Sequence, residues 1–214
     1  MTPLVTVERP AAGDPDGLLV LHHGRGTDEN DLLGLADALD PERRLRVVSA
    51  RGPLTVAGWP GYHWYLVPRV GYPDRTSFDA AREALAELHD GLWEEDGLGP
   101  GRTVLGGFSM GAVMSHAMAL GADRPAVAGI LAFSGFVPTV PGWRPSFEGR
   151  QATRAFVAHG EADPVIEIGF GRAARDLLVA GGIDVTYRES GVVHTIDPAT
   201  VPVAAEWLAA TVPS

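Results

Sequence analysis

The feature that most constrains this fold is the alternation of short apolar runs with longer amphipathic segments along the chain. The apolar runs, which we predict as strands, cover residues 17–23, 45–50, 102–108, 127–135, 153–160 and 184–190. Helix-like spacing of apolar residues falls between them, at residues 31–39, 77–94, 109–120, 171–180 and 203–210. Such an alternation is typical of a parallel sheet that is covered on both faces. The sequence therefore predicts an α/β fold with a doubly wound, mostly parallel sheet.

Helix ends and loops carry weaker signals. Thr27 or Asp28 is expected to cap the helix at residues 31–39, and Gly121 to end the helix at residues 109–120. Residues 51–73 form a long loop rich in Gly, Pro and aromatic side chains. With 214 residues, 45% of them hydrophobic, we expect a single domain over residues 1–214, without internal repeats or a linker.

The charge of the chain limits its partners. A formal net charge of -10 disfavours the phosphate-neutralising surface of a nucleic-acid-binding protein and weakens attraction to anionic lipid headgroups. The first residues lack the basic and apolar regions of a secretory leader, and no run approaches the length of a membrane span. We therefore expect a cytoplasmic protein that acts on a small molecule, with no nucleic acid and no integral membrane association.

Lysine and cysteine are both missing from the sequence, and each absence excludes several classes of reaction or site. All 17 basic residues are arginine, so no lysine can form a Schiff base or serve in a phosphate-binding loop. No cysteine is present, which removes thiolate nucleophiles, disulfides and cysteine-ligated zinc.

In open α/β sheets ligands bind at the carboxyl ends of the strands, so functional side chains are expected directly after strands. The stretch "GFSMG" places Ser109 at such a point, between a predicted strand and a predicted helix. This is the setting of an elbow that exposes a nucleophilic serine, and Gly107 and Gly111 would let the strand and helix backbones pass close to the turn. The alternative is a glycine-rich turn with a helix-capping serine.

A serine nucleophile needs a base, and the base needs an orienting acid. His194 follows the last predicted strand, and Asp163 follows the strand at residues 153–160, so both satisfy the strand-end criterion. The order Ser109, Asp163, His194 is that of α/β-hydrolases. We expect His159 to pack or hydrogen-bond instead, and the adjacent His22 and His23 to point to opposite faces and hence not to share a metal.

Backbone amides complete the predicted site. The amide of Met110, directly after the serine, and that of Arg25 in "HHGRG" are expected to form an oxyanion hole. Standing alone, the second stretch has a less favoured alternative, an ordinary strand-to-helix turn.

Three further patterns admit a second interpretation. "GFGRAA" at residues 169–174 matches a dinucleotide fingerprint, but too little chain follows it to build a nucleotide domain, which favours a helix start packed on the sheet. "DENDLLG" fails the calcium-loop spacing and favours helix capping. The loop "GWPGYHWYLVP" lacks the basic residues of a nucleic-acid stacking platform, so it favours an acyl pocket wall or core packing of Trp59 and Trp64.

Several segments in order, "LHHGRGTDENDLLGLA", "GGFSMGA", "GILAFSGFVP", "HGEADPVI" and "GVVHTI", resemble the small phospholipase/carboxylesterase family of α/β-hydrolases, which includes the acyl-protein thioesterases. The resemblance covers residues 18–208. It implies the α/β-hydrolase fold with a minimal cap or none, and the same triad and oxyanion amides. It also implies an acyl site bordered by Trp64, Tyr65, Phe136 and Val165.

The chain departs from the family pattern at two positions. The family often has an apolar residue where Arg25 stands, and glutamine or asparagine where Met110 stands. Both positions act through the backbone, so the departures bear on substrate preference rather than on catalysis.

We therefore predict a serine carboxylesterase that hydrolyses short to medium acyl esters without a metal or cofactor. An acyl thioesterase or lysophospholipase with the same triad is the alternative, followed by a non-catalytic binding module of the same fold. A homodimer is compatible with the sequence, which leaves the oligomeric state open.

Overall fold

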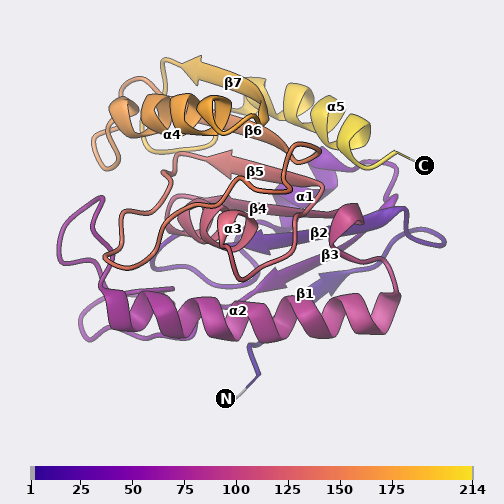
Figure 1. The fold of residues 1–214 in the computed structure, drawn as a ribbon, viewed down its shortest axis with the longest axis horizontal. Coiled ribbons are helices and arrows are strands. Elements are labelled where there is room, and N and C mark those ends of the chain that lie inside the picture. The colour runs from indigo at the N-terminus through magenta and orange to yellow at the C-terminus, as the bar shows by residue number, and fades with distance from the viewer. Residues whose placement is uncertain (1–2, 214) are drawn as a thin grey trace.

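A seven-stranded sheet forms the centre of the computed structural model, which describes residues 3–213 (Figure 1). The strand order is β1-β3-β2-β4-β5-β6-β7, with β1 antiparallel to β3 and every other pair parallel. The strands are β1 (Thr6–Arg9), β2 (Gly17–His22), β3 (Leu45–Ala50), β4 (Thr103–Phe108), β5 (Gly129–Phe133), β6 (Arg154–Gly160) and β7 (Asp184–Ser190). The predicted α/β class with a mostly parallel sheet is confirmed.

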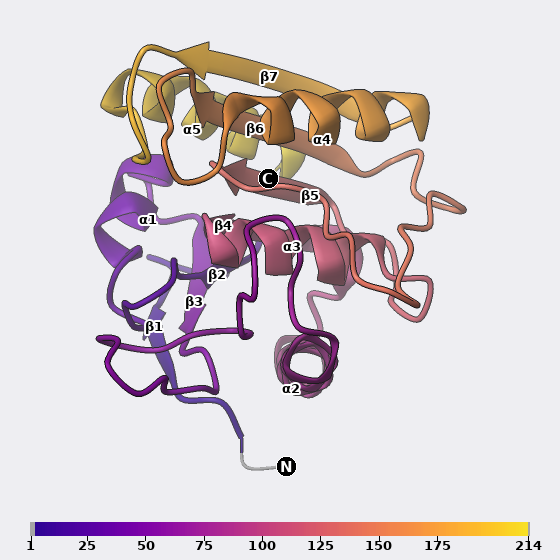
Figure 2. The same ribbon diagram turned by 90° about the vertical axis from the view of Figure 1, so that its left-hand side faces the viewer.

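Helices cover both faces of the sheet (Figures 1 and 2). They are α1 (Leu33–Leu39), α2 (Arg75–Asp96), α3 (Met110–Leu120), α4 (Ile168–Ala180) and α5 (Val201–Thr211), with short 3-10 turns η1 (Pro100–Arg102) and η2 (Pro198–Thr200). Helices α2, α3 and α4 pack on one face, and α1 and α5 on the other. Within the described residues, no helix has both the length and the apolar character needed to cross a bilayer.

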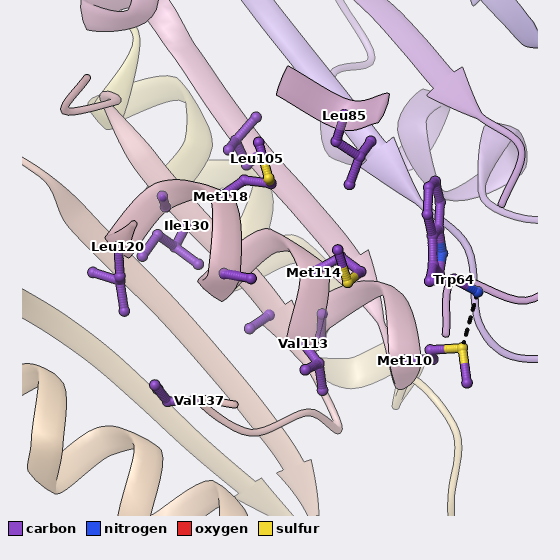
Figure 3. Packing of buried hydrophobic residues seen from close by; sticks show 14 of the residues in the cluster. Trp64, Leu85, Leu105, Met110, Val113, Met114, Met118, Leu120, Ile130 and Val137 are labelled. Atoms are coloured by element: carbon purple, nitrogen blue, oxygen red, sulfur yellow. Dashed lines mark hydrogen bonds between the residues drawn. The ribbon is translucent and has the colours of Figure 1, made fainter. Parts of the chain in front are cut away.

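The core explains why the central strands read as continuous apolar runs. Adjacent residues of β4 point to opposite faces, so Leu105 packs with the cluster under α3 while Val104 packs with the cluster under α5. Met114 and Met118 of α3 lie on the Leu105 side (Figure 3). Both faces of the strand are thus buried, as expected for a parallel sheet.

Some predicted details are wrong. Helix α1 begins at Leu33, and its N-cap, Leu32, makes no side-chain cap hydrogen bond. The expected caps act within the preceding loop instead: the Thr27 hydroxyl donates to the Gly24 carbonyl (3.0 Å), and the Asp28 carboxylate accepts from the Asn30 amide (2.9 Å). Strand β1 was not predicted, because Thr6–Arg9 is a short edge strand without an apolar run.

Two glycine-containing stretches lie as predicted. Gly121 is the C-cap of α3, with an extended backbone (φ -65°, ψ 132°). "GFGRAA" lies inside α4, where a Cβ on Gly171 would come within 2.6 Å of the His159 ring. The expected close packing of this stretch on the sheet is confirmed.

Candidate active site

Ser109 occupies a sharp turn between β4 and α3. Its φ of 55° and ψ of -118° lie in a region that residues with a side chain rarely adopt. The turn is held by a hydrogen bond from the Ser109 amide to the Phe133 carbonyl (2.9 Å). A Cβ on Gly107 would lie 2.5 Å from the carbonyl carbon of Gly111, and a Cβ on Gly111 would overlap the His22 carbonyl oxygen. The predicted need for both glycines is confirmed.

The structure brings Ser109, His194 and Asp163 together from the ends of β4, β7 and β6. His194 Nε2 lies 2.8 Å from Ser109 Oγ, and His194 Nδ1 lies 2.6 Å from Asp163 Oδ2. The loops that bear the histidine and the acid are joined by a backbone hydrogen bond from Ala162 to Val192 (3.2 Å). This linear arrangement allows a proton to pass from the serine to a histidine oriented by a carboxylate.

Asp163 is a buried carboxylate, and both of its oxygens take part in hydrogen bonds. Its Oδ1 accepts from the amides of Val165 (2.8 Å) and Ile166 (2.9 Å). Burial alone would raise the pKa of Asp163, but the hydrogen bonds from His194 and from these two amides outweigh it, so the pKa lies below its usual range. Asp163 is therefore ionised at neutral pH and can stabilise a positive charge on His194.

His159 stands behind this carboxylate. Its Nε2 lies 2.7 Å from the Ile166 carbonyl oxygen and 3.5 Å from Asp163 Oδ2. The carbonyl can only accept, so Nε2 carries the proton. Burial lowers the pKa of His159. The expected hydrogen-bonding role of this residue is confirmed.

The two predicted oxyanion donors are the amides of Met110 and Arg25, two residues that line the same cavity as Ser109. Met110 is the first residue of α3, and the first amides of a helix have no acceptor within it. The Arg25 amide donates to no acceptor among residues 3–213. Its neighbour, Gly26, is fixed by a hydrogen bond from its amide to the Tyr62 carbonyl (2.9 Å). Both predicted oxyanion donors are thus unoccupied groups at the ends of β2 and β4.

The Met110 side chain has a structural task that the sequence did not reveal. Its sulfur accepts a hydrogen bond from the Trp64 amide at 3.2 Å (Figure 3). The Trp64 indole in turn donates to the His23 carbonyl oxygen (3.0 Å). Trp64 is fully buried and lines neither cavity beside Ser109. The prediction that Trp64 contacts substrate is therefore wrong: it supports the turn that bears Arg25.

Two cavities meet at Ser109. A small one of about 50 Å³ is not lined by His194 and is mostly apolar. Its lining includes three residues expected at the acyl site, Tyr65, Phe136 and Val165. A larger open groove of about 640 Å³ also includes Ser109 in its lining, together with His194, Phe108 and Ile196, among others. The Phe108 and His194 rings pack with centroids 4.9 Å apart.

The adjacent His22 and His23 have different hydrogen-bond partners. Strand β2 ends at His22, so the alternation of a strand does not extend to His23. Both rings contact Trp64, with centroid separations of 5.5 and 5.3 Å. His22 Nδ1 pairs with the Ser115 hydroxyl (2.8 Å), while His23 Nε2 accepts from the Gly52 amide (2.9 Å).

Comparison with known proteins agrees with this geometry. The fold and a serine at a strand–helix elbow define an α/β serine hydrolase. The phospholipase/carboxylesterase family model matches residues 5–212, and the chain belongs to this family. An esterase of Escherichia coli, YpfH, is 28% identical over 92% of this chain and 83% of its own.

Two further proteins extend the comparison. Acyl-protein thioesterase 1 of Yarrowia lipolytica is 27% identical over 84% of this chain and 83% of its own. The crystal structure of esterase PE8 is 29% identical, with a TM-score of 0.79 and coverage of 98% of this chain and 100% of that one. The enzyme class predicted from the sequence, a serine hydrolase, is confirmed.

Proposed function

We propose that the protein hydrolyses carboxylic esters of short to medium acyl chains through an acyl-enzyme on Ser109. The observation that carries this proposal is the hydrogen-bonded series Ser109, His194, Asp163, placed where two cavities meet. Each cavity can receive one half of an ester whose carbonyl carbon lies at Ser109 Oγ.

The reaction follows from the placement of protons. His194 Nε2 takes the proton from Ser109 as its oxygen attacks the carbonyl carbon, and Asp163 holds the other ring nitrogen protonated. The oxygen of the tetrahedral intermediate then accepts from the amides of Arg25 and Met110, where one donor lowers the barrier by about 3 kcal/mol. His194 gives its proton to the departing alcohol oxygen, and water removes the acyl group by the same steps.

The two cavities have different roles in this scheme. His194 must protonate the leaving group, so the alcohol lies in the groove that His194 lines. The acyl chain then occupies the small pocket beside Phe136 and Tyr65. Its volume of about 50 Å³ favours short chains, with longer ones reaching solvent past the exposed Val165.

An acyl thioesterase or lysophospholipase would use the same residues. The open groove of about 640 Å³ accommodates a bulky leaving group, and one relative is named an acyl-protein thioesterase. The choice depends on which leaving group the groove binds, because the acyl-enzyme is the same in each case.

The test is hydrolysis of p-nitrophenyl esters from acetate to decanoate by the wild type and by Ser109→Ala. We expect short-chain esters to be preferred and activity to vanish in the variant while its circular dichroism is unchanged. Equal rates in the two proteins would overturn the proposal. A matched series of S-acyl thioesters, run in parallel, separates the esterase from the thioesterase.

A further inference from the structure

Two arginines, and no acidic residue among the described residues, line the small pocket beside Ser109. They are Arg25, whose guanidinium lies over Trp59 at the edge of the neighbouring groove, and Arg69. This is unexpected for a chain with a net charge of -10, in which acidic side chains outnumber basic ones. The pocket is therefore locally cationic on an acidic protein.

Neither arginine is neutralised by an ion pair. Within residues 3–213, no carboxylate lies within salt-bridge distance of Arg25 or Arg69. Several other arginines do pair with acids, as Arg51 does with Glu29 (2.5 Å). The two pocket arginines instead stack on aromatic rings, Arg25 over Trp59 at 4.2 Å and Arg69 over Tyr72 at 3.7 Å.

This stacking prepares the guanidinium groups for an anion. A ring contact occupies the face of the guanidinium plane and leaves the N–H groups at its edge available. The turn that carries Arg69 is fixed by a hydrogen bond from the Tyr72 amide to the Arg69 carbonyl (3.0 Å). The Thr139 hydroxyl also donates to the Gly71 carbonyl oxygen. Arg69 is thus carried by an anchored segment rather than by a free loop.

The charge of Arg25 reaches the pocket wall. Burial raises the pKa of Tyr65 well above its usual value, and the positive charge of Arg25 opposes that rise. Tyr65 lines the same pocket as Arg69. A charged group bound there would therefore interact with both cations.

The position of Arg69 indicates which half of a preferred substrate carries the negative charge. Arg69 lines the small pocket but not the groove that contains His194, whereas Arg25 borders both. The small pocket receives the acyl chain in the function proposed above. We propose that the enzyme prefers esters whose acyl group carries a carboxylate at the end of a short apolar stem, that is, half-esters of dicarboxylic acids. This inference rests on the proposed ester hydrolysis.

The experiment compares pairs in which a terminal carboxylate replaces a terminal methyl group. Monoethyl esters of succinic, glutaric and adipic acid are measured in a pH-stat against ethyl butyrate, valerate and hexanoate. A second pair, 4-acetoxybutanoate and butyl acetate, places the carboxylate on the alcohol. We expect kcat/KM to favour the anionic acyl member by about tenfold at low salt, and the preference to decline as salt screens the exposed arginines.

Arg69→Gln removes the cation that belongs to the acyl side alone. The ratio of anionic to neutral kcat/KM should fall toward one, mainly through KM. Arg102→Gln is the matched control, because Arg102 is exposed and lies before β4, at the opposite end of that strand from Ser109. The ratio should not change in this variant.

The outcomes separate the two proposals. Ser109-dependent hydrolysis of p-nitrophenyl butyrate without any preference for the anionic acyl esters overturns this inference and leaves the esterase proposal standing. A preference confined to 4-acetoxybutanoate also overturns it, because the anion then binds on the alcohol side. An absence of Ser109-dependent hydrolysis for every ester overturns both.

Discussion

The indole nitrogen of Trp64 donates a hydrogen bond of 3.0 Å to the carbonyl oxygen of His23. His23 precedes the turn that carries the Arg25 amide, and Trp64 is itself held by the sulfur of Met110. The aromatic loop therefore connects the residues that carry both proposed oxyanion donors. Because both donors act through the backbone, their positions depend on this buried contact.

Replacing Trp64 with Phe tests that connection. The ring contacts remain, but the His23 carbonyl loses its donor, and the turn that bears Arg25 is free to shift. We expect kcat for a neutral ester to fall about tenfold, with KM changing less. Trp93→Phe is the control, because its indole hydrogen bond to Thr103 (2.9 Å) lies at the amino end of β4. A similar loss of kcat in both variants would contradict the account.

Gly111 should not tolerate a side chain. An added Cβ would overlap the His22 carbonyl oxygen and lie 2.6 Å from that of His23. We expect Gly111→Ala to reduce the free energy of unfolding by about 3 kcal/mol or to prevent folding. Gly91→Ala, within α2, meets no atom within 4 Å and should raise it by about 0.5–1 kcal/mol. Urea denaturation measures both, and tolerance of Gly111→Ala would show that helix and strand are not in contact here.

Asp163→Asn separates charge from shape at the acid. The side-chain carbonyl oxygen of the introduced asparagine can still accept hydrogen bonds from the backbone N–H groups of Val165 and Ile166. The neutral side chain no longer stabilises the imidazolium or selects the tautomer of His194. We expect kcat to fall by about four orders of magnitude. The far-ultraviolet circular dichroism should be unchanged. A fall of less than about tenfold would show that Asp163 does not orient the base.

The sequence could predict those features that depend on the order of the elements along the chain and on the periodicity of apolar residues. The central strands are buried on both faces, so their apolar runs were visible, and β3 and β7 have the expected bounds. Ser109, Asp163 and His194 were found because each follows a strand, and parallel strands bring their carboxyl ends together. No distance information was needed for either inference.

Other features depend on how distant loops pack. Met110 and Trp64 are 46 positions apart, and neither composition nor spacing indicates that a thioether meets a backbone amide. The unpaired state of Arg69 is likewise visible only once the neighbouring carboxylates are placed. Strand β1 was not predicted, because only one of its four residues, Arg9, is buried. The Arg9 guanidinium donates a hydrogen bond to the Asp40 carboxylate.

Buried histidines predict loss of stability in acid. Burial lowers the pKa of His89 to about 3 and that of His116 to about 4. The unfolded chain takes up these protons below about pH 6.5, while the folded chain does not, so stability is full above that pH and falls below it. Each histidine should lower the free energy of unfolding by about 2 kcal/mol at pH 5, relative to its value above pH 6.5.

His116→Leu measures this contribution, because neither ring nitrogen of His116 has a hydrogen-bond partner within residues 3–213. The difference in unfolding free energy between pH 7 and pH 5 should shrink by about 2 kcal/mol relative to the wild type. Met114→Leu, a volume-conserving change on the same helix, should leave it unaltered. An unchanged difference in His116→Leu would mean that His116 is protonated in the folded protein.

The central claim is that the Ser109 side-chain oxygen, Oγ, is the atom that becomes acylated. The most direct measurement is the intact mass of the protein after incubation with a p-nitrophenyl alkylphosphonate, which traps a nucleophilic serine as a stable ester. The account predicts one added phosphonyl group, located on the peptide that contains Ser109 and absent from the Ser109→Ala variant. An unlabelled wild type, or a label that persists in that variant, would contradict it.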